Sequence, residues 1–250
     1  MIVLKSSAEI EAMHCANQVV HRALKAVEEA AVPGASTADL DRLAEDLIRA
    51  SGGEPAFKGY RGFPATLCTS INDEIVHGIP SPKVRLAEGN IVSVDCGVIL
   101  DGFFGDAAVT FAIGSVNGEV ERLMTVTRRC LDDAVDQVAP GNRIGDVGAA
   151  VQARAEGAGF GVVREFVGHG IGRALHEEPQ VPNYGQAGRG QILRPGMVLA
   201  IEPMITAGSW RVKIDDDGWT ARTEDGKLAA HFEYSVAVTP NGHRVLGLEE

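Results

Sequence analysis

The chain has 250 residues, which is enough to bury one sizeable core, so we expect a single domain over residues 1–250. Hydrophobic residues account for 45% of the chain and charged residues for 23%, as in ordinary soluble globular enzymes. The net charge of −11 argues against a surface that binds nucleic acid stably.

The N-terminal residues and the cysteines indicate a cellular compartment. Glu9, Glu11 and His14 interrupt any apolar stretch, so no signal peptide is visible, and no apolar run is long enough to span a bilayer. The four cysteines lack Cys-x-x-Cys spacing, which predicts neither a disulfide framework nor a structural zinc site. We therefore expect a cytoplasmic protein without membrane contact.

Two helices are predicted at the start of the chain. Apolar residues recur at three- and four-residue steps over residues 7–30, behind a serine cap, and Pro33-Gly34 breaks this helix. A second helix follows a Ser36/Thr37 cap and ends at Gly52-Gly53.

Strands and a second pair of helices follow. Alternating or β-branched runs predict three strands, at residues 65–71, 91–100 and 107–113. Two more helices are predicted at residues 119–138 and 144–158. The last third returns to predicted strands around residues 162–167, 197–201, 210–214 and 231–238.

The second half of the chain repeats the first at a fixed spacing. Pro33-Gly34 recurs as Pro140-Gly141, an offset of 107 residues (140 − 33). The pattern Leu-x-x-Gly-x-Ile-Val-x-Val-Asp at 86–95 recurs as Leu-x-x-Gly-x-Val-Leu-x-Ile-Glu at 193–202, again offset by 107 (193 − 86). These matches predict a duplicated α+β unit whose halves share one core, with the two terminal carboxylates equivalent about a pseudo-two-fold axis.

A buried pair of carboxylates is predicted on one hairpin. Asp95 lies in an apolar strand, where a charge needs a cation or a proton to neutralise it. Asp101-Gly102 predicts a two-residue turn, and counting back from this turn places Asp95 opposite Ala108. Asp106 then lies diagonally from Asp95 on the same face, with the Cβ atoms roughly 7 Å apart. The alternative, one solvent-facing aspartate and one turn aspartate, fits the apolar strand poorly.

Three further residues stand in settings typical of metal ligands. Glu202 interrupts the apolar run 198–203, Glu233 lies in a similar run, and His169 lies between glycines that let other groups approach the backbone. A lone histidine in a glycine-rich loop more often has a structural role. The four carboxylates in apolar settings make a metal ligand the favoured interpretation of His169. Oxygen donors with one imidazole suit Mn, Fe(II), Co or Zn in a dinuclear hydrolytic centre.

These residues resemble the five metal ligands of the methionine aminopeptidases, in the order Asp95, Asp106, His169, Glu202 and Glu233. The motifs Asn72–Pro80, Gly168–Gly172, His176-Glu177-Glu178-Pro179 and Ile201–Met204 agree with the family over essentially the whole chain. The resemblance implies the pita-bread fold of the creatinases and aminopeptidases, with two pseudosymmetric halves around a central antiparallel sheet. It implies two divalent ions per chain.

The resemblance also implies roles for residues outside the metal site. His176 would donate to the developing oxyanion, and His77 would meet the scissile amide nitrogen. Glu202 would serve both as a ligand and as the general base that takes a proton from the metal-bridging water. The methionine pocket would be lined by Tyr60, Phe63, Cys68 and Trp219. For His77 and Trp219, simple turn positions are the alternative.

The implied activity is hydrolysis of the initiator methionine from nascent polypeptides whose second residue is small and uncharged. The chain departs from the family at Arg61, where a histidine is common, and at Leu175, where a phenylalanine is common. It resembles the short bacterial form, and we expect a monomer. The acidic net charge is compatible with a brief ribosome contact through a local basic patch. An Xaa-Pro peptidase (prolidase or aminopeptidase P) and a non-catalytic binding protein on the same fold are the alternatives.

Overall fold

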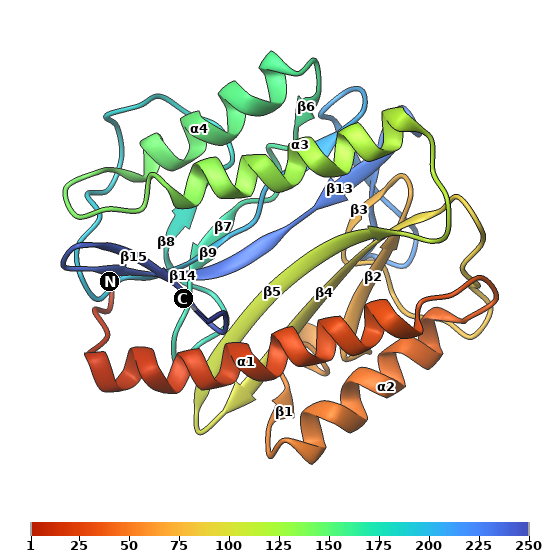
Figure 1. Ribbon diagram of the computed structural model, residues 1–250, viewed down its shortest axis with the longest axis horizontal. Helices are drawn as coiled ribbons and strands as arrows, with labels where there is room; N and C mark the ends of the chain where they lie inside the picture. The colour runs from red at the N-terminus through yellow and green to blue at the C-terminus, as the bar shows by residue number, and fades with distance from the viewer. Residues whose placement is uncertain (1, 250) are drawn as a thin grey trace.

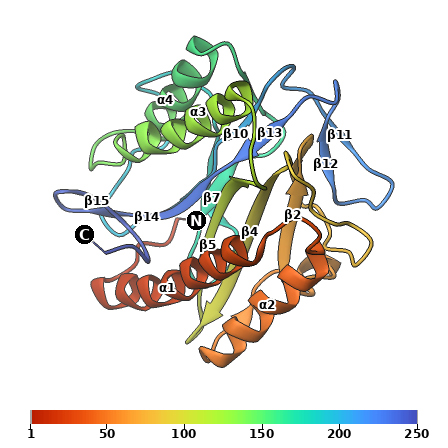
Figure 2. The ribbon, with the colours of Figure 1, turned by 45° about the vertical axis from the view of Figure 1, so that its right-hand side comes forward.

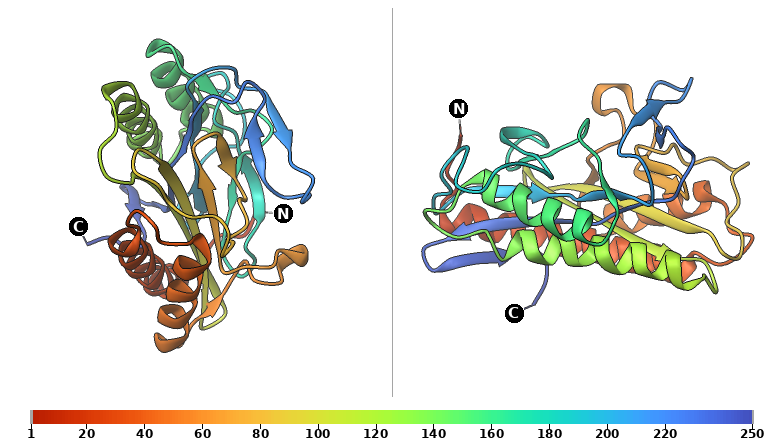
Figure 3. Two further views of the ribbon diagram at one scale, coloured as in Figure 1. Left: turned by 90° about the vertical axis from the view of Figure 1, so that its right-hand side faces the viewer. Right: turned by 90° about the horizontal axis from the view of Figure 1, so that it is seen from above.

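The computed structural model describes residues 2–249, with four helices lying over one face of a curved sheet (Figure 1; Figure 3). The helices are α1 (Ser7–Ala30), α2 (Thr37–Ala50), α3 (Gly118–Val135) and α4 (Ile144–Gly157). Both predicted caps of the first two helices are present. Ser6 accepts from the amide of Glu9 while the Glu9 carboxylate accepts from the amide of Ser6, and Ser36 caps α2.

The main sheet has nine strands, and all of its pairings are antiparallel, as predicted for the fold class. Its order runs through β1 (Glu54–Pro55), β4 (Ile91–Leu100), β5 (Phe103–Ala112), β14 (Glu233–Thr239), β9 (Val198–Ile201), β7 (Gly168–Gly170) and β8 (Glu177–Val181). Two strands pair beside this path, β2 (Leu67–Ile71) with β4 and β15 (Gly242–Val245) with β14. The sheet thereby joins the two halves of the chain where β5 meets β14.

Two three-stranded sheets lie beside the main one. The first contains β13 (Ala229–His231), β10 (Met204–Thr206) and β6 (Gly161–Val162), and the second contains β11 (Val212–Ile214), β12 (Ala221–Thr223) and β3 (Glu74–Val76). A short 3-10 helix covers Tyr60–Gly62. In the left panel of Figure 3 the β11–β12 hairpin projects from the side of the main sheet that the helices leave open.

The internal repeat predicted at an offset of 107 residues is confirmed in detail. Gly34 donates its amide to the carbonyl of Leu86, and Gly141 donates in the same way to Leu193. The two isolated bridges, Ser36 with Arg85 and Arg143 with Ile192, differ by the same offset. Figure 2 shows the corresponding helix pairs, α1 with α2 and α3 with α4, one over each half of the sheet.

The two largest clusters of buried apolar side chains lie one under each helix pair. Leu40 and Ile48 belong to the first cluster, and Leu123 and Leu199 belong to the second. Val109 of β5 packs against both clusters, so the two halves adjoin at the sheet. The extent of a single domain over residues 1–250 stays a prediction. No helix among the described residues combines the length and the apolar composition needed to cross a membrane.

Several strands of the last third differ from the prediction. The strand predicted at 162–167 stops at Val162, because the chain leaves the small sheet towards the site. Trp210 precedes β11, where it contacts two arginine side chains. The strand predicted at 231–238 is two strands, β13 and β14, in different sheets. Periodicity did not reveal this break, because no glycine or proline lies between the two apolar runs.

Candidate active site

The β4–β5 hairpin places two carboxylates on the open face of the sheet. Its turn is Asp101-Gly102, both in the left-handed region, and Leu100 pairs with Phe103 as predicted. Counting back through the register, Asp95 pairs with Ala108 and Asp106 pairs with Gly97. The two aspartates are therefore diagonal neighbours. Gly97 also lets Phe57 approach the strand, because a Cβ there would overlap its ring.

The second half supplies the other two carboxylates and the histidine. Glu233 begins β14 and pairs with Ala108, and Glu202 directly follows β9. The carbonyl of Glu202 accepts from the Asn183 side chain at 3.0 Å, which fixes the backbone at this point. His169 lies on β7, with Nε2 3.6 Å from Glu202 Oε1 and 3.9 Å from Asp106 Oδ2. Its Nδ1 lies 2.9 Å from the carbonyl of Gly170, so Nε2 faces the carboxylates.

Burial dominates the electrostatics of this cluster. It raises the pKa of Asp95 to about 7 and raises the pKa values of Asp106, Glu202 and Glu233 well above the ordinary range. Neighbouring carboxylates raise the last three further. Burial also lowers the pKa of His169 to about 4, which keeps its imidazole neutral. Without a cation, the four carboxyl groups cannot all be ionised at neutral pH.

The donor set fits divalent metal ions. Within residues 2–249, three buried carboxylate oxygens have no hydrogen-bond partner: Asp95 Oδ1, Asp106 Oδ1 and Glu233 Oε1. Ligand atoms of Asp106, His169 and Glu233 all lie within 4.8 Å of one another. Buried carboxylate oxygens that lack donors are costly in a folded protein unless a cation neutralises them. The cluster can therefore bind metal.

We expect the affinity for divalent ions to fall as the pH decreases from 7.5 to 6.0. Each carboxyl group has a folded-state pKa raised from its ordinary value, so the folded chain holds protons that an entering ion must displace. Each displaced proton weakens apparent binding by about tenfold per pH unit below the raised pKa. Titration calorimetry with Mn²⁺ at the two pH values tests this expectation. Equal affinity at the two pH values would contradict protonated carboxyl groups in the metal-free protein. His169 does not contribute to the expected change, because its pKa is lowered to about 4 and it stays neutral at both pH values.

The carboxylates open into a cavity of about 170 Å³. All eleven residues predicted for the site line this cavity: Tyr60, Phe63, Cys68, His77, Asp95, Asp106, His169, His176, Glu202, Trp219 and Glu233. The structure adds Phe57, which sequence reasoning missed, together with Arg61 and Leu175. Phe57 carried no motif signal, because its place depends on the approach of its ring to Gly97.

Two aromatic residues of the predicted methionine pocket contact each other at one wall of the cavity. The rings of Phe63 and Trp219 meet edge to face, 5.1 Å apart, and Trp219 also lies 6.4 Å from His77. The Trp219 amide donates to Asp217 Oδ1 at 2.8 Å. Trp219 therefore both follows the turn, which was the alternative interpretation, and contributes its ring to the cavity.

The Arg222 side chain connects the two hairpins that carry His77 and Trp219. Its guanidinium lies 2.9 Å from Asp73 and 2.7 Å from Glu74 on the first hairpin, and 2.6 Å from Asp215 on the second. Glu74 also accepts from the amide of Ile71 at 2.7 Å. This network fixes the backbone just before His77, whose φ of 62° lies in the left-handed region.

His176 lies at the mouth of the cavity and contacts Tyr60. The Tyr60 hydroxyl is 2.8 Å from His176 Nδ1, and the two rings stack with centroids 5.4 Å apart. The other side of His176 faces His169, at 4.3 Å between ring centroids. Burial and the nearby Arg61 guanidinium lower the pKa of His176. Arg61 itself lies over the Tyr60 ring, so the substituted position is part of the rim.

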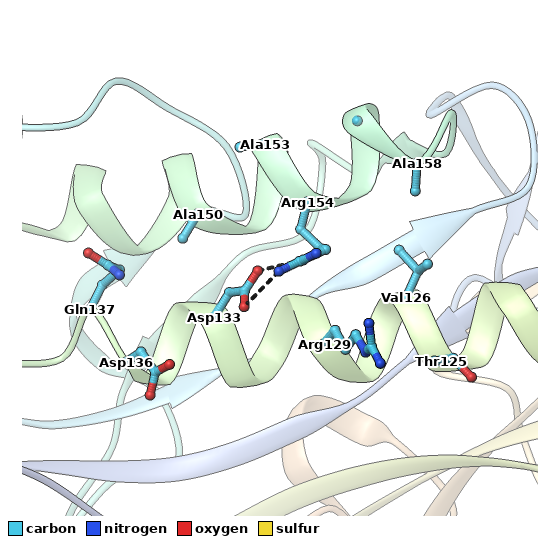
Figure 4. A pocket seen from close by; sticks show the side chains of 11 residues that line it. Thr125, Val126, Arg129, Asp133, Asp136, Gln137, Ala150, Ala153, Arg154 and Ala158 are labelled. Atoms are coloured by element: carbon cyan, nitrogen blue, oxygen red, sulfur yellow. Dashed lines mark hydrogen bonds and ion pairs between the residues drawn. The ribbon is translucent and has the colours of Figure 1, made fainter.

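A larger cavity, of about 590 Å³, lies between α3 and α4 (Figure 4). Its walls combine small side chains such as Ala150 and Ala153 with the ion pair between Asp133 and Arg154. None of the eleven predicted site residues lines it. Arg129 and Asp136 also line it, but no histidine or cysteine side chain among residues 2–249 lies in its walls. The smaller cavity, with its buried carboxylates and histidines, is the one equipped for chemistry.

Comparison with known proteins agrees with this geometry. The model of metallopeptidase family M24 matches residues 11–240. The methionine aminopeptidase of Clostridium acetobutylicum is 52% identical, with both chains covered completely. The chain belongs to the methionine aminopeptidases of metallopeptidase family M24. Another relative within family M24, methionine aminopeptidase 1 of Mycobacterium tuberculosis, is 47% identical over 98% of this chain and 94% of its own.

Solved structures place the chain in the same part of family M24. Methionine aminopeptidase from Thermotoga maritima superposes with a TM-score of 0.98 at 46% identity, with both chains fully covered. Prolidase from Pyrococcus furiosus shares the fold, with a TM-score of 0.79 at 23% identity over 99% of this chain and 66% of its own. The predicted family and the pita-bread fold are thus confirmed, and the chain is a metallopeptidase.

Proposed function

We propose that this enzyme removes the N-terminal methionine from polypeptides whose second residue is small and uncharged. The observation that carries the proposal is the position of the buried carboxylate cluster at the inner end of a small, largely apolar cavity. A polypeptide that enters such a cavity must do so by its end. The close similarity to methionine aminopeptidases over the whole chain supports methionine as the residue that enters.

Two divalent ions would be held by Asp95, Asp106, His169, Glu202 and Glu233, and Co, Mn, Fe(II) and Zn all suit these donors. The unpartnered oxygens of Asp95, Asp106 and Glu233 support this assignment. When bound, such ions would acidify water and polarise the scissile carbonyl. The surrounding residues then have the tasks of binding the substrate and moving protons.

Glu202 is the proposed general base. Its carboxylate is close to His169 and reaches the cavity, so it can accept a proton from an attacking water. His176, at the mouth, is proposed to donate to the carbonyl oxygen as negative charge develops there. His77, on the opposite side near Trp219, is proposed to meet the scissile amide nitrogen. Both histidines have a lowered pKa, so each is neutral at pH 7 and carries one ring proton.

The Tyr60 hydroxyl selects which nitrogen of His176 carries that proton. If the hydroxyl donates to Nδ1 at 2.8 Å, the ring proton lies on Nε2, which is free to donate to the oxyanion. Tyr60, predicted as a pocket residue, thus acquires a second task. Replacing Tyr60 by phenylalanine should lower kcat by about tenfold, in the range of one lost hydrogen bond, with little change in KM.

Steady-state kinetics on a Met-Ala peptide measures the Tyr60→Phe effect. Tyr184→Phe, which makes the same change on a ring outside the cavity lining, is the matched control. An unchanged kcat in Tyr60→Phe would show that His176 needs no partner at Nδ1.

The methionine side chain is proposed to lie among Phe63, Cys68 and Trp219. A flexible thioether adapts to irregular apolar walls and makes favourable contacts with aromatic ring edges. Burial raises the pKa of the Cys68 thiol, so Cys68 contributes a small apolar surface here. The substrate's free α-amino group would lie at the ion site that the carboxylate cluster forms, which restricts cleavage to the first residue.

The substrates are proposed to be nascent polypeptides, and the enzyme a cytoplasmic monomer that contacts the ribosome transiently. The four cysteines support a reducing compartment, because all four are free thiols and three of them are buried.

An assay on two peptide classes tests the proposed function. The protein is depleted of metal, reconstituted with Co²⁺ or Mn²⁺, and given Met-Ala-Ser and Ala-Pro-Ser peptides. We expect release of methionine from the first peptide and negligible cleavage of the second. Preferential cleavage before proline would favour the Xaa-Pro peptidase alternative, and no cleavage of either would favour the binding-protein alternative.

A further inference from the structure

The N-terminal segment of the chain lies against the loop that carries His176. Lys5 is 7% exposed, and its backbone amide donates to the carbonyl of Gly196 at 2.7 Å. Its Nζ lies 2.5 Å from Glu177 Oε2 and 3.2 Å from the carbonyl of Val3. Lysine is almost never buried without a partner, so the position of this side chain depends on Glu177.

Glu177 in turn closes the loop between β7 and β8. Its Oε1 accepts from the amides of Arg173 at 2.9 Å and Ala174 at 3.3 Å, while its Oε2 accepts from Lys5. The Lys5 side chain passes over Gly172, where any Cβ would overlap Lys5 Cε. One half-buried carboxylate therefore connects the N-terminal segment with two amides of the loop.

The loop has other anchors at its two ends. Ile171 donates its amide to Val198 at 3.1 Å, the Gly172 carbonyl accepts from the amide of Phe104 at 2.8 Å, and the Leu175 side chain is buried. Between these anchors, the amides of Arg173 and Ala174 depend on Glu177.

Residues 172–176 form bends outside any strand, and His176 stands at their end, directly before Glu177. The His176 side chain is exposed, and its bond to Tyr60 fixes the ring but not the backbone. The backbone at His176 is held where β8 begins, at the residue that pairs with Gly170 and binds Lys5.

We propose that Lys5 is a positioning residue for His176 and acts through Glu177, so that the N-terminal segment is part of the active-site structure. This inference rests on the role proposed above for His176. A buried ion pair contributes little net stability compared with an apolar pair, because desolvation offsets the attraction. A buried ion pair does specify geometry, because each charge is neutralised only at the position of its partner. Here the pairing of Lys5 with Glu177 fixes Glu177, the first residue of β8.

Replacement of Lys5 by methionine tests the proposal. The change keeps the length of the side chain but removes the charge, leaving Glu177 free to turn towards solvent. We expect kcat for a Met-Ala peptide to fall by about tenfold to a hundredfold, the range for small displacements of a catalytic group, with KM within about twofold. Lys5→Arg keeps the charge and should retain most of kcat. Lys25→Met, the same substitution at an exposed position of α1, should leave kcat unchanged.

Two further measurements separate positioning from stability. In a His176→Ala background, Lys5→Met should cause no additional loss of kcat, because its effect passes through the missing imidazole. Hydrogen exchange of the Arg173 and Ala174 amides should accelerate in Lys5→Met while the helices stay protected. A lowered Tm with unchanged kcat and unchanged exchange would overturn the proposal. If the wild type released no methionine, the proposed function would fail, whereas the exchange rates would still test the link between Lys5 and the loop.

Discussion

Replacing Asp106 by asparagine is expected to abolish metal binding at one ion position or both and to lower kcat/KM by more than about a hundredfold. Even outer partners of metal ligands cost up to about a hundredfold, and Asp106 is a proposed ligand. Its buried Oδ1 lacks a hydrogen-bond partner within residues 2–249, and its Oδ2 lies near His169. Asparagine keeps the shape but removes the charge. Metal content by elemental analysis and kcat/KM on a Met-Ala peptide measure the effect.

The fold should survive the Asp106→Asn change. Asp106 is 4% exposed and has a raised pKa, so a neutral side chain suits the ion-free protein at least as well. Asp101→Asn is the matched control, because it makes the same change at the turn of the same hairpin. Asparagine tolerates the φ of 50° found there. An Asp106→Asn protein that kept two ions and full activity would refute the assignment of the ligands.

Peptides with a large second residue are expected to react at least about a hundredfold more slowly than those with a small one. The cavity of about 170 Å³ is bounded at its mouth by Tyr60, Arg61 and His176, which leaves little space for a second side chain. One methylene in a confined apolar site is worth up to about two-hundredfold in rate, and leucine adds three carbons to alanine. The measurement is kcat/KM for Met-Ala-Ser against Met-Leu-Ser.

A control on the substrate separates size from sequence. Met-Ala-Leu places the bulky side chain one residue further along, outside the cavity, and should react about as fast as Met-Ala-Ser. Equal rates for Met-Ala-Ser and Met-Leu-Ser would mean that the mouth opens beyond the dimensions described here. The proposed limit to small second residues would then be wrong.

The β4–β5 hairpin and the internal repeat could be predicted because their signals are local or periodic. Asp101-Gly102 fixes the turn, the turn fixes the register, and the register fixes which face Asp95 and Asp106 share. The strand β7 was not predicted, since the glycines that flank His169 have low strand propensity. The neighbouring strands can approach β7 closely because Gly168 and Gly170 have no Cβ. A Cβ at either position would overlap backbone atoms of those strands.

Contacts between distant residues were beyond sequence reasoning. The family resemblance placed Tyr60 and His176 in the same site, but it gave no hydrogen bond between residues 116 positions apart. Lys5 and Glu177 are 172 positions apart, and although Glu177 belongs to the His176–Pro179 motif, that motif gave no indication of a lysine partner. Such pairs depend on how the finished sheet brings its loops together, and periodicity carries no information about that.

The repeat described above has a consequence for the origin of the site. Each half contributes one carboxylate from an inner strand, Asp106 or Glu233, and one from the strand beside it or its end, Asp95 or Glu202. A half-length chain would carry only two of these groups. Two such chains related by a rotation axis would bring four together, because a symmetric dimer doubles every group near its axis. The present enzyme has the arrangement expected from gene fusion of such a dimer, followed by divergence of the halves, since only the second half contributes a histidine, His169, to the cluster.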